Sequence, residues 1–359
     1  MRRAVRRSKS AGLLRAALAA ALAVSLLSVA SPPPAAAAAG RTVVVAPWGV
    51  DAGNLGNRPY RSIAMGIRHA LPGDTILVRG GVYYENAGWG AVPGTADAPI
   101  LLTAAAGERV VIAGTLTLKG ADYWTVSRIN VTYSSRVGRT ESLVLFNGGH
   151  DWQFVGGEVW GSRGVSNLMV NSSTTYGVAR NYRIAGNCIH SNMAKGDALL
   201  NDHNLYIQPG ATSGPGLIER NIIFGAPNGG NIKAASGSTT VGTGNVLIRY
   251  NTMAAGKAGV IVGYGSNNIV MSRNLFAAPV GGTGGDAAIR LYHLYGARNY
   301  VVDSAMSGFK MLIRRWSDSR TTVAPYRNKV VRSTFNRQGV CVGYRPTDAA
   351  SQAYGRFAA

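Results

Sequence analysis

Acidic residues are scarce in this 359-residue sequence, which has 16 Asp and Glu against 37 Lys and Arg and a net charge of +21. It has only five glutamates, and none of them lies beyond Glu219. No two aspartates are adjacent. Oxygen-ligated metal cages and two-carboxylate glycosidase sites both need clustered acidic residues. The composition therefore disfavours both kinds of site and favours acidic partners, which a basic protein attracts at long range.

The chain also has only two cysteines, Cys188 and Cys341. In the repeat register described below they lie about five repeats apart, which is about 24 Å at one strand spacing per repeat. A disulfide cannot cross such a distance. The sequence therefore predicts that they are not bonded, and two cysteines this far apart do not predict a metal site.

A long apolar run appears only in the leader, where six basic residues precede Ala16 to Ala30. That run is too short for a typical membrane span, and Pro32 to Ala39 supply the break and the small residues of a cleavage site. We expect a signal peptide over residues 1–39, with the Sec and twin-arginine routes left open. The mature chain, with 31 basic and 16 acidic residues, should be secreted, extracellular, monomeric and without further membrane contact.

A repeat dominates the rest of the chain. Val126 to Val131 aligns with seven later segments, and the shared turn position recurs every 23 to 34 residues, at 129, 157, 187, 221, 251, 274, 304 and 333. Each unit holds two or three short strands and no helix, which is typical of a β-solenoid. The prediction is an all-β, single-stranded right-handed parallel β-helix over residues 40–345, followed by a C-terminal tail over 346–359.

Asparagine fills the turn position in four of these repeats, at Asn187, Asn221, Asn251 and Asn274. Asparagine tolerates left-handed backbone, and stacked amides bond to one another between repeats. We therefore interpret this column as structural. Tyr60 to Leu71 is the only amphipathic helical pattern, and we expect it to cap the open N-terminal end of the coil.

The N-terminal part resembles a known group. The stretches Pro72 to Val78, Gly81-Val82-Tyr83, Ala98-Pro99-Ile100 and Ala121 to Val126 look like the start of secreted pectate-lyase-like β-helix proteins, and are most similar to chondroitinase B and alginate lyase type polysaccharide lyases. The resemblance implies β-elimination on acidic polysaccharide, with a Lys or Arg as base and calcium or a second cation on the uronate carboxylate. It fixes no site positions.

The second strand of each repeat supplies the candidate site. Its inward pairs are expected to be Leu143/Leu145, Leu168/Val170, Leu205/Ile207, Ile232/Ala234, Val260/Val262, Ile289/Leu291, Met311/Ile313 and Val340/Val342. The outward residues between them are then Val144, Met169, Tyr206, Lys233, Ile261, Arg290, Leu312 and Cys341. Tyr206 and Lys233 should be adjacent, and Arg290 should lie about 10 Å from Lys233.

These residue types suggest roles in an elimination. Lys233 is the candidate base, because a Lys in a partly dry groove has a lowered pKa. Arg290 would grip the carboxylate, and Tyr206 or His203 would protonate the leaving oxygen. Candidate substrate-binding residues are Lys195, Asn204, Asn231, Tyr292 and His293. Asp197 and Asp202 are the candidate ligands if calcium binds.

Two alternatives remain open at this point. The first is a non-catalytic extracellular β-helix that binds anionic wall polymer or polysaccharide through its basic face. The second is a glycoside hydrolase, which ranks lower because the acidic residues are not clustered. Nucleic acid is not an expected partner, since outside the cell acidic polysaccharide or anionic wall polymer is the expected partner of a basic protein. Nucleotide binding has no support, since no phosphate-binding loop leads from a strand into a helix.

Overall fold

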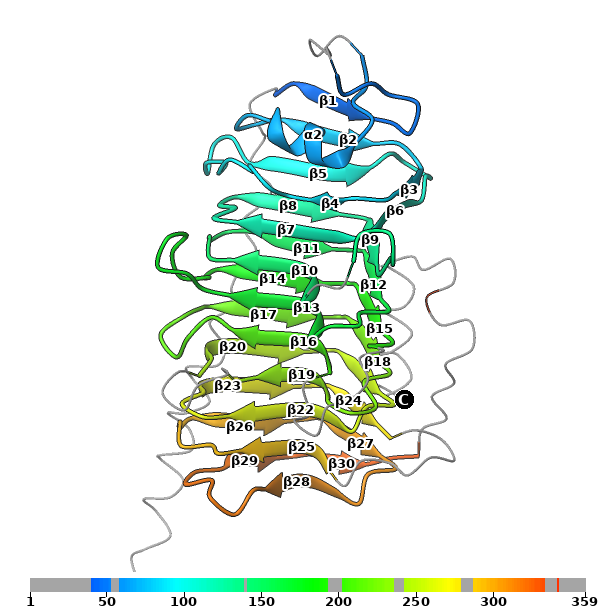
Figure 1. Cartoon of the computed structure of the whole chain (residues 1–359). Helices are drawn as coiled ribbons and strands as arrows, with labels where there is room; N and C mark the ends of the chain where they lie inside the picture. Colours follow the sequence, from blue (N-terminus) through cyan, green and yellow to red (C-terminus); the bar gives the residue numbers. More distant parts are fainter. Residues whose placement is uncertain are drawn as a thin grey trace, which may run out of the picture. The chain divides into compact units, whose positions relative to one another are not determined.

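The computed structural model describes residues 40–52, 58–138, 141–192, 202–235, 242–278, 287–332 and 341. In these residues the chain coils through three parallel β-sheets, which we name A, B and C, and visits them in that order in each turn (Figure 1). All strand pairs within the sheets are parallel, and each strand pairs with its equivalent in the turns before and after it. The fold predicted from the repeat, a parallel β-helix, is confirmed.

Sheet A contains β1 (Thr42–Val45), β2 (Thr75–Val78), β5 (Ile100–Ala104), β8 (Trp124–Ser127), β11 (Gln153–Val155), β14 (Tyr182–Ala185), β17 (Gly216–Glu219), β20 (Gly244–Arg249), β23 (Asn267–Ser272), β26 (Asn299–Val302) and β29 (Val323–Tyr326). Sheet B contains β3 (Gly81–Tyr83), β6 (Val110–Ala113), β9 (Ile129–Thr132), β12 (Glu158–Trp160), β15 (Cys188–His190), β18 (Ile222–Phe224), β21 (Thr252–Ala254), β24 (Leu275–Ala277), β27 (Ala305–Ser307) and β30 (Lys329–Val330). Sheet C contains β4 (Asn86–Ala87), β7 (Thr115–Lys119), β10 (Ser142–Asn147), β13 (Ser166–Asn171), β16 (His203–Gln208), β19 (Gly230–Ala234), β22 (Ala258–Gly263), β25 (Ala287–Tyr292) and β28 (Met311–Arg315).

The expected N-terminal helix is α2 (Ile63–Arg68). Ser62 caps it by accepting a hydrogen bond from the Met65 N–H, and Glu85 accepts two more from the first turn. Ile63 and Ile67 join the core beside β1, β2 and β4, so the helix covers apolar residues at the start of the coil. Among the described residues, no helix is long and apolar enough to cross a membrane.

The asparagine column is a buried ladder at the turn from sheet A to sheet B. The side-chain amide of Asn187 donates to Oδ1 of Asn221, Asn221 donates to Asn251, and Asn251 donates to Asn274, at 2.9–3.1 Å. The left-handed backbone belongs to the residue before each asparagine, as at Arg220 and Tyr250. Each amide satisfies buried backbone groups in neighbouring turns, which fixes the turns in register.

The last repeat differs from the prediction. Val301 pairs with Pro325 and Met306 with Val330, so the copy that follows Val301 to Met306 spans β29 and β30. The predicted turn position at 333 lies outside the described residues. The turn position of the observed copy is Asn328, whose Oδ1 accepts a hydrogen bond from the Ser304 N–H at 2.9 Å. This copy was missed because Pro325 stands where the earlier copies have an apolar strand residue.

The prediction that the two cysteines are not bonded is wrong. Cys341 forms a disulfide with Cys188 of β15, with a distance of 6.1 Å between the Cα atoms. The distance argument assumed that Cys341 continues the repeat as an outward residue of sheet C. Instead it lies against the outer side of sheet B, in an apolar cluster with Ile222, Phe224 and Leu275 that is separate from the main core.

Candidate functional site on sheet C

Tyr206, Lys233 and Arg290 lie in one row on the outer side of sheet C, as predicted. Tyr206 is the register partner of Lys233, Lys233 is the partner of Ile261, and Ile261 is the partner of Arg290. Arg290 is therefore two strand spacings from Lys233, about 10 Å. The inward neighbours of this row, such as Leu205 and Ile232, belong to the main core.

The ends of the row need correction. Leu168 pairs with Val144, so Val144 and Phe146 point inward and Leu145 points outward, one position away from the prediction. At the other end Arg290 pairs with Arg314, which makes Arg314 the outward residue in place of Leu312. Cys341 does not belong to the row at all. The C-terminal end of the row is thus basic, and the apolar end predicted there is wrong.

The charged form of Lys233 is destabilised by burial. Only 9% of its surface is exposed although it points away from the core. Burial lowers its pKa to about 8, because the charged ammonium loses its hydration. Its Nζ lies 4.6 Å from the centre of the Tyr206 ring, a cation–π contact that partly replaces the lost water. A lysine with this pKa is partly uncharged near neutral pH.

Tyr206 has the opposite character. It is 5% exposed, and burial, with smaller contributions from Tyr264 and Glu141, raises the pKa of its hydroxyl above the usual value. The hydroxyl therefore keeps its proton over the physiological pH range. Beside Lys233 it is suited to donate a proton or a hydrogen bond and is not suited to act as a base.

His203 is fully buried next to these two residues, with its ring 5.5 Å from that of Tyr206. Its pKa is far below the usual value because of burial first and the nearby Lys233 charge second. Nδ1 accepts a hydrogen bond from the Gly230 N–H at 3.1 Å, which places the ring proton on Nε2. Nε2 has no hydrogen-bond partner among the described residues. His203 is thus a neutral imidazole with one unsatisfied donor.

Arg290 is nearly as buried as Lys233. Burial lowers its pKa from the usual value, yet a guanidinium remains charged in proteins. This charge gives the row a fixed cation beside the titratable Lys233. The arrangement is suited to an anion that spans two strand spacings.

Asn204 and Asn231 lie in a second buried ladder at the turn into sheet C. Asn167 donates to Oδ1 of Asn204 at 2.8 Å, and Asn204 donates to Oδ1 of Asn231 at 2.9 Å. Their amides also bond to the main chain at His190, Phe224 and Ala254. The structure thus gives these two asparagines a role in holding the turn, and we do not include them in the proposed site.

The calcium hypothesis finds no support in the described residues. Asp202 is buried, and its Oδ2 accepts a hydrogen bond from the Asn228 amide at 2.9 Å. Asp197 and Lys195 lie outside the described residues. The one group of potential metal ligands in the described chain is Cys188, His190 and Cys341, and its sulfur atoms are joined in the disulfide. A lone buried Asp does not fit the six to eight oxygen ligands of calcium.

Tyr292 and His293 lie at the C-terminal end of sheet C in an aromatic cluster. The Tyr292 ring is 4.1 Å from that of His293 and 5.6 Å from those of Tyr264 and Trp316. Nδ1 of His293 bonds to the Asp318 carboxylate. The cluster is partly exposed and lies three strands from Tyr206.

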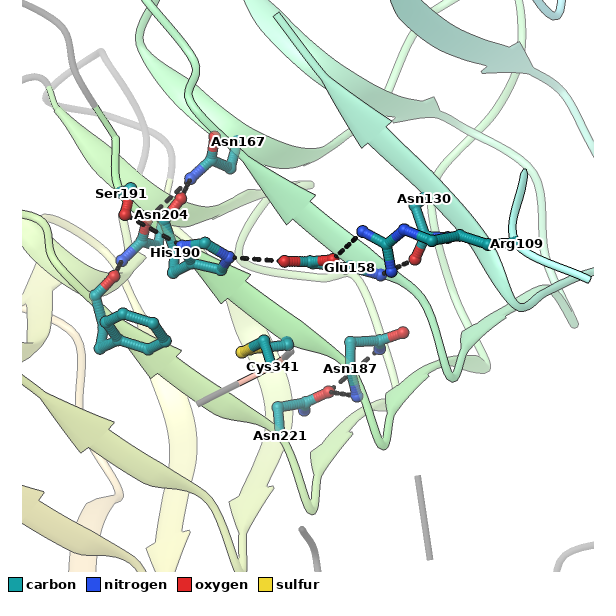
Figure 2. Close-up of a disulfide and its surroundings, with 12 residues drawn as sticks. Arg109, Asn130, Glu158, Asn167, Asn187, His190, Ser191, Asn204, Asn221 and Cys341 are labelled. Carbon is teal, nitrogen blue, oxygen red and sulfur yellow. Dashed lines mark hydrogen bonds and ion pairs between the residues drawn. A yellow bond between two sulfur atoms is a disulfide. The ribbon is translucent and has the colours of Figure 1, made fainter. Parts of the chain in front are cut away.

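A second polar cluster, on the outer side of sheet B, was not predicted (Figure 2). The Glu158 carboxylate lies between Arg109 and His190, at 2.6 Å and 3.0 Å. Burial raises the pKa of Glu158, but the hydrogen bonds from His190 and Arg109 outweigh it and hold the pKa below its usual value. The His190 ring stacks on Phe224 at 4.7 Å beside the disulfide. Since every charge here has a partner, we assign the cluster to structure.

Comparisons with known proteins identify the fold. No family model matches the sequence, and no curated protein matches it. Among solved structures, the family 6 alginate lyase AlyGC has a TM-score of 0.52 and 12% identity over 76% of this chain and 40% of its own. The chain is a parallel β-helix.

Two other solved structures are similar to the same degree. XylC in complex with xylose has a TM-score of 0.52 and 14% identity, covering 79% of this chain and 71% of its own. The family GH136 lacto-N-biosidase from Eubacterium ramulus has a TM-score of 0.52 and 11% identity, covering 82% of this chain and 68% of its own. This chain thus spans less than half the length of AlyGC and about two thirds of the other two.

Proposed function

We propose that the chain is an exported carbohydrate-active β-helix protein that cleaves acidic, uronate-containing polysaccharide by β-elimination. The observation that carries the proposal is Lys233, a buried lysine with a pKa of about 8 in the middle of a row that also holds a fixed cation. The similarity in fold to the alginate lyase AlyGC agrees with this class of substrate.

The proposed reaction assigns one step to each residue. The uncharged amine of Lys233 takes the proton from the carbon beside the uronate carboxylate. Arg290 holds that carboxylate and stabilises the negative charge that develops on it. The electron pair forms the ring double bond as the glycosidic C–O bond breaks, and the hydroxyl of Tyr206 protonates the leaving oxygen. Lys233 then returns the proton to Tyr206 directly or through solvent. His203 is fully buried, so its Nε2–H reaches a substrate oxygen only if the residues that cover it move.

The pKa of Lys233 sets the expected pH dependence. With a pKa of about 8, about one tenth of the molecules have an uncharged Lys233 at pH 7, against less than about one in a thousand for an ordinary lysine. The reaction needs the uncharged form, so kcat/KM should rise through pH 8 and level off above it. A profile that is flat between pH 6.5 and 9 would contradict Lys233 as the base.

The burial of Lys233 favours a second candidate, the non-catalytic binding protein. Because so little of its surface is exposed, a polymer reaches the amine only if neighbouring parts of the protein move. If they do not move, the cations of sheet C act only by attracting an anionic polymer. The hydrolase alternative lacks such support, since the outward row of β7 to β28 has no carboxylate among the described residues.

The test is an activity assay on the mature protein with pectate, alginate and glycosaminoglycans, with calcium and with chelator. β-Elimination creates an unsaturated uronate that absorbs in the ultraviolet. We expect new absorbance with at least one polymer, its loss in Lys233→Ala, and its survival in chelator. Salt-sensitive binding without new absorbance on any polymer would establish the second candidate and refute the first.

A further inference from the structure

Three side chains form an exposed aromatic and cationic group at the N-terminal end of sheet C, which we name the Trp89 platform. Trp89 follows β4, Lys119 ends β7, and Tyr176 lies between β13 and β14. Nζ of Lys119 is 4.0 Å from the centre of the Trp89 ring and 5.7 Å from that of Tyr176. Trp89 and Tyr176 are 55% and 39% exposed, so neither ring is packed in the hydrophobic core.

The unneutralised charge of Lys119 distinguishes the platform from a second pair of an exposed tryptophan and a basic residue. Trp48, which is 65% exposed, lies beside Arg79 at 5.5 Å. Arg79 is neutralised by Glu108 at 2.7 Å, whereas Lys119 has no ion pair among the described residues. A free ammonium held between two exposed rings is complementary to a flat ligand with a negative substituent.

The backbone beside Lys119 supports this arrangement. Gly120 has φ +59, and a Cβ at this position would lie 3.3 Å from the Tyr176 ring. Glycine therefore provides the left-handed turn after β7 and leaves room for the ring to approach the sheet.

A line of amides connects the platform to the candidate site. Lys119 is the register partner of Asn147, Asn147 of Asn171, and Asn171 of Gln208 in β16. Asn147, Asn171 and Gln208 are partly exposed residues, although Oδ1 of Asn147 is buried, and Gln208 is on the same side of β16 as Tyr206. The separation between Lys119 and Gln208 is three strand spacings, about 14 Å. Amides in such a line suit the hydroxyls of an extended sugar chain.

We propose that the Trp89 platform is a distal subsite that binds an acidic sugar of the polymer whose chain also contacts the Lys233 row. The apolar face of the sugar stacks on Trp89 or Tyr176, its carboxylate bonds to Lys119, and the amides take hydroxyls of the residues between. This inference rests on the proposed function for its ligand class. It adds that affinity depends on chain length, because only a long chain reaches both places.

Binding to sodium alginate and to neutral dextran tests the platform directly. We expect Trp89→Ala and Lys119→Gln to weaken alginate binding about tenfold, the typical order for one lost aromatic or charge contact. Trp48→Ala is the matched control and should bind as the wild type does. Trp89→Phe should recover most of the affinity, which separates a stacking role from a folding role. Equal affinity in Trp89→Ala and the wild type, or no alginate binding by the wild type, would overturn the inference.

Two measurements distinguish a failure of this inference from a failure of the proposed function: the kinetics of Trp89→Ala, and alginate binding by Lys233→Ala. If the protein is a lyase, Trp89→Ala should raise KM for the polymer with kcat unchanged and leave a disaccharide or trisaccharide substrate unaffected, since these are too short to reach the platform. In Lys233→Ala, alginate binding should persist and still depend on Trp89. Retained Trp89-dependent binding without any cleavage by the wild type would refute the lyase and support the subsite. Cleavage with an unchanged KM in Trp89→Ala would support the lyase and refute the subsite.

Discussion

Replacing Lys233 with methionine should make the protein more stable at neutral pH. The pKa of Lys233 is about 8 in the folded chain and about 10.4 in an unfolded chain. At pH 7 the folded state therefore bears a cost of about 3 kcal/mol for burying the charge. Loss of the cation–π contact with Tyr206 offsets about 0.5–2 kcal/mol of this. The net gain should be about 1–3 kcal/mol, which is several degrees in Tm.

The pH dependence makes this prediction specific to Lys233. A lysine whose folded pKa is lowered carries its full cost below pH 8, loses it progressively between pH 8 and about 10.4, and carries none above that. The advantage of Lys233→Met in urea unfolding should therefore shrink to less than about 1 kcal/mol at pH 10. Lys119→Met is the matched control, because it removes a partly exposed lysine from the same sheet. Destabilisation by Lys233→Met at both pH values would refute the reasoning.

Three further predictions concern the scaffold. Asn251→Ala should cost about 2–4 kcal/mol in urea unfolding, because it leaves several buried ladder groups unsatisfied. Glu158→Gln should cost about 1–3 kcal/mol of unfolding free energy at pH 7. Since the folded pKa of Glu158 is lowered, the difference in stability between wild type and variant should fade as the pH drops below about 4. A difference that stays constant with pH would contradict the ion-pair account. Mass spectrometry of unreduced peptides should find Cys188 linked to Cys341, and Cys188→Ser should cost about 2–5 kcal/mol, the range for a long closed loop.

The repeat was predictable from the sequence because each turn buries the same pattern. An apolar alternation in sheet A and an apolar pair in sheet C recur from Val126 to Met306, and asparagine stands at the turn in four successive copies, from Asn187 to Asn274. The row Tyr206, Lys233, Ile261, Arg290 follows from the same alternation. The alternation is ambiguous in β10, where Leu143 and Val144 are both apolar, and in β28, where Met311 stands near Ile313. The predicted register of these two strands was therefore wrong.

Features that depend on contacts between distant parts of the chain were not predictable. Cys341 reaches β15 although it lies 11 residues beyond β30, the last strand among the described residues, and no local pattern shows where a chain goes after it leaves a repeat. A lowered pKa of Lys233 was expected from chemistry, but the size of the pKa shift depends on the burial of the side chain, which only the fold defines. The Trp89 platform joins residues from three turns, and single aromatic residues between strands give no signal in the sequence.

The most direct test of the proposed lyase is the pH profile of polymer cleavage by the wild type beside Lys233→Ala. The account predicts ultraviolet absorbance from unsaturated uronate, with kcat/KM that rises through a pKa near 8 and is lost in the variant. Cleavage by Lys233→Ala at the wild-type rate, or the absence of unsaturated product on every acidic polymer, would contradict it.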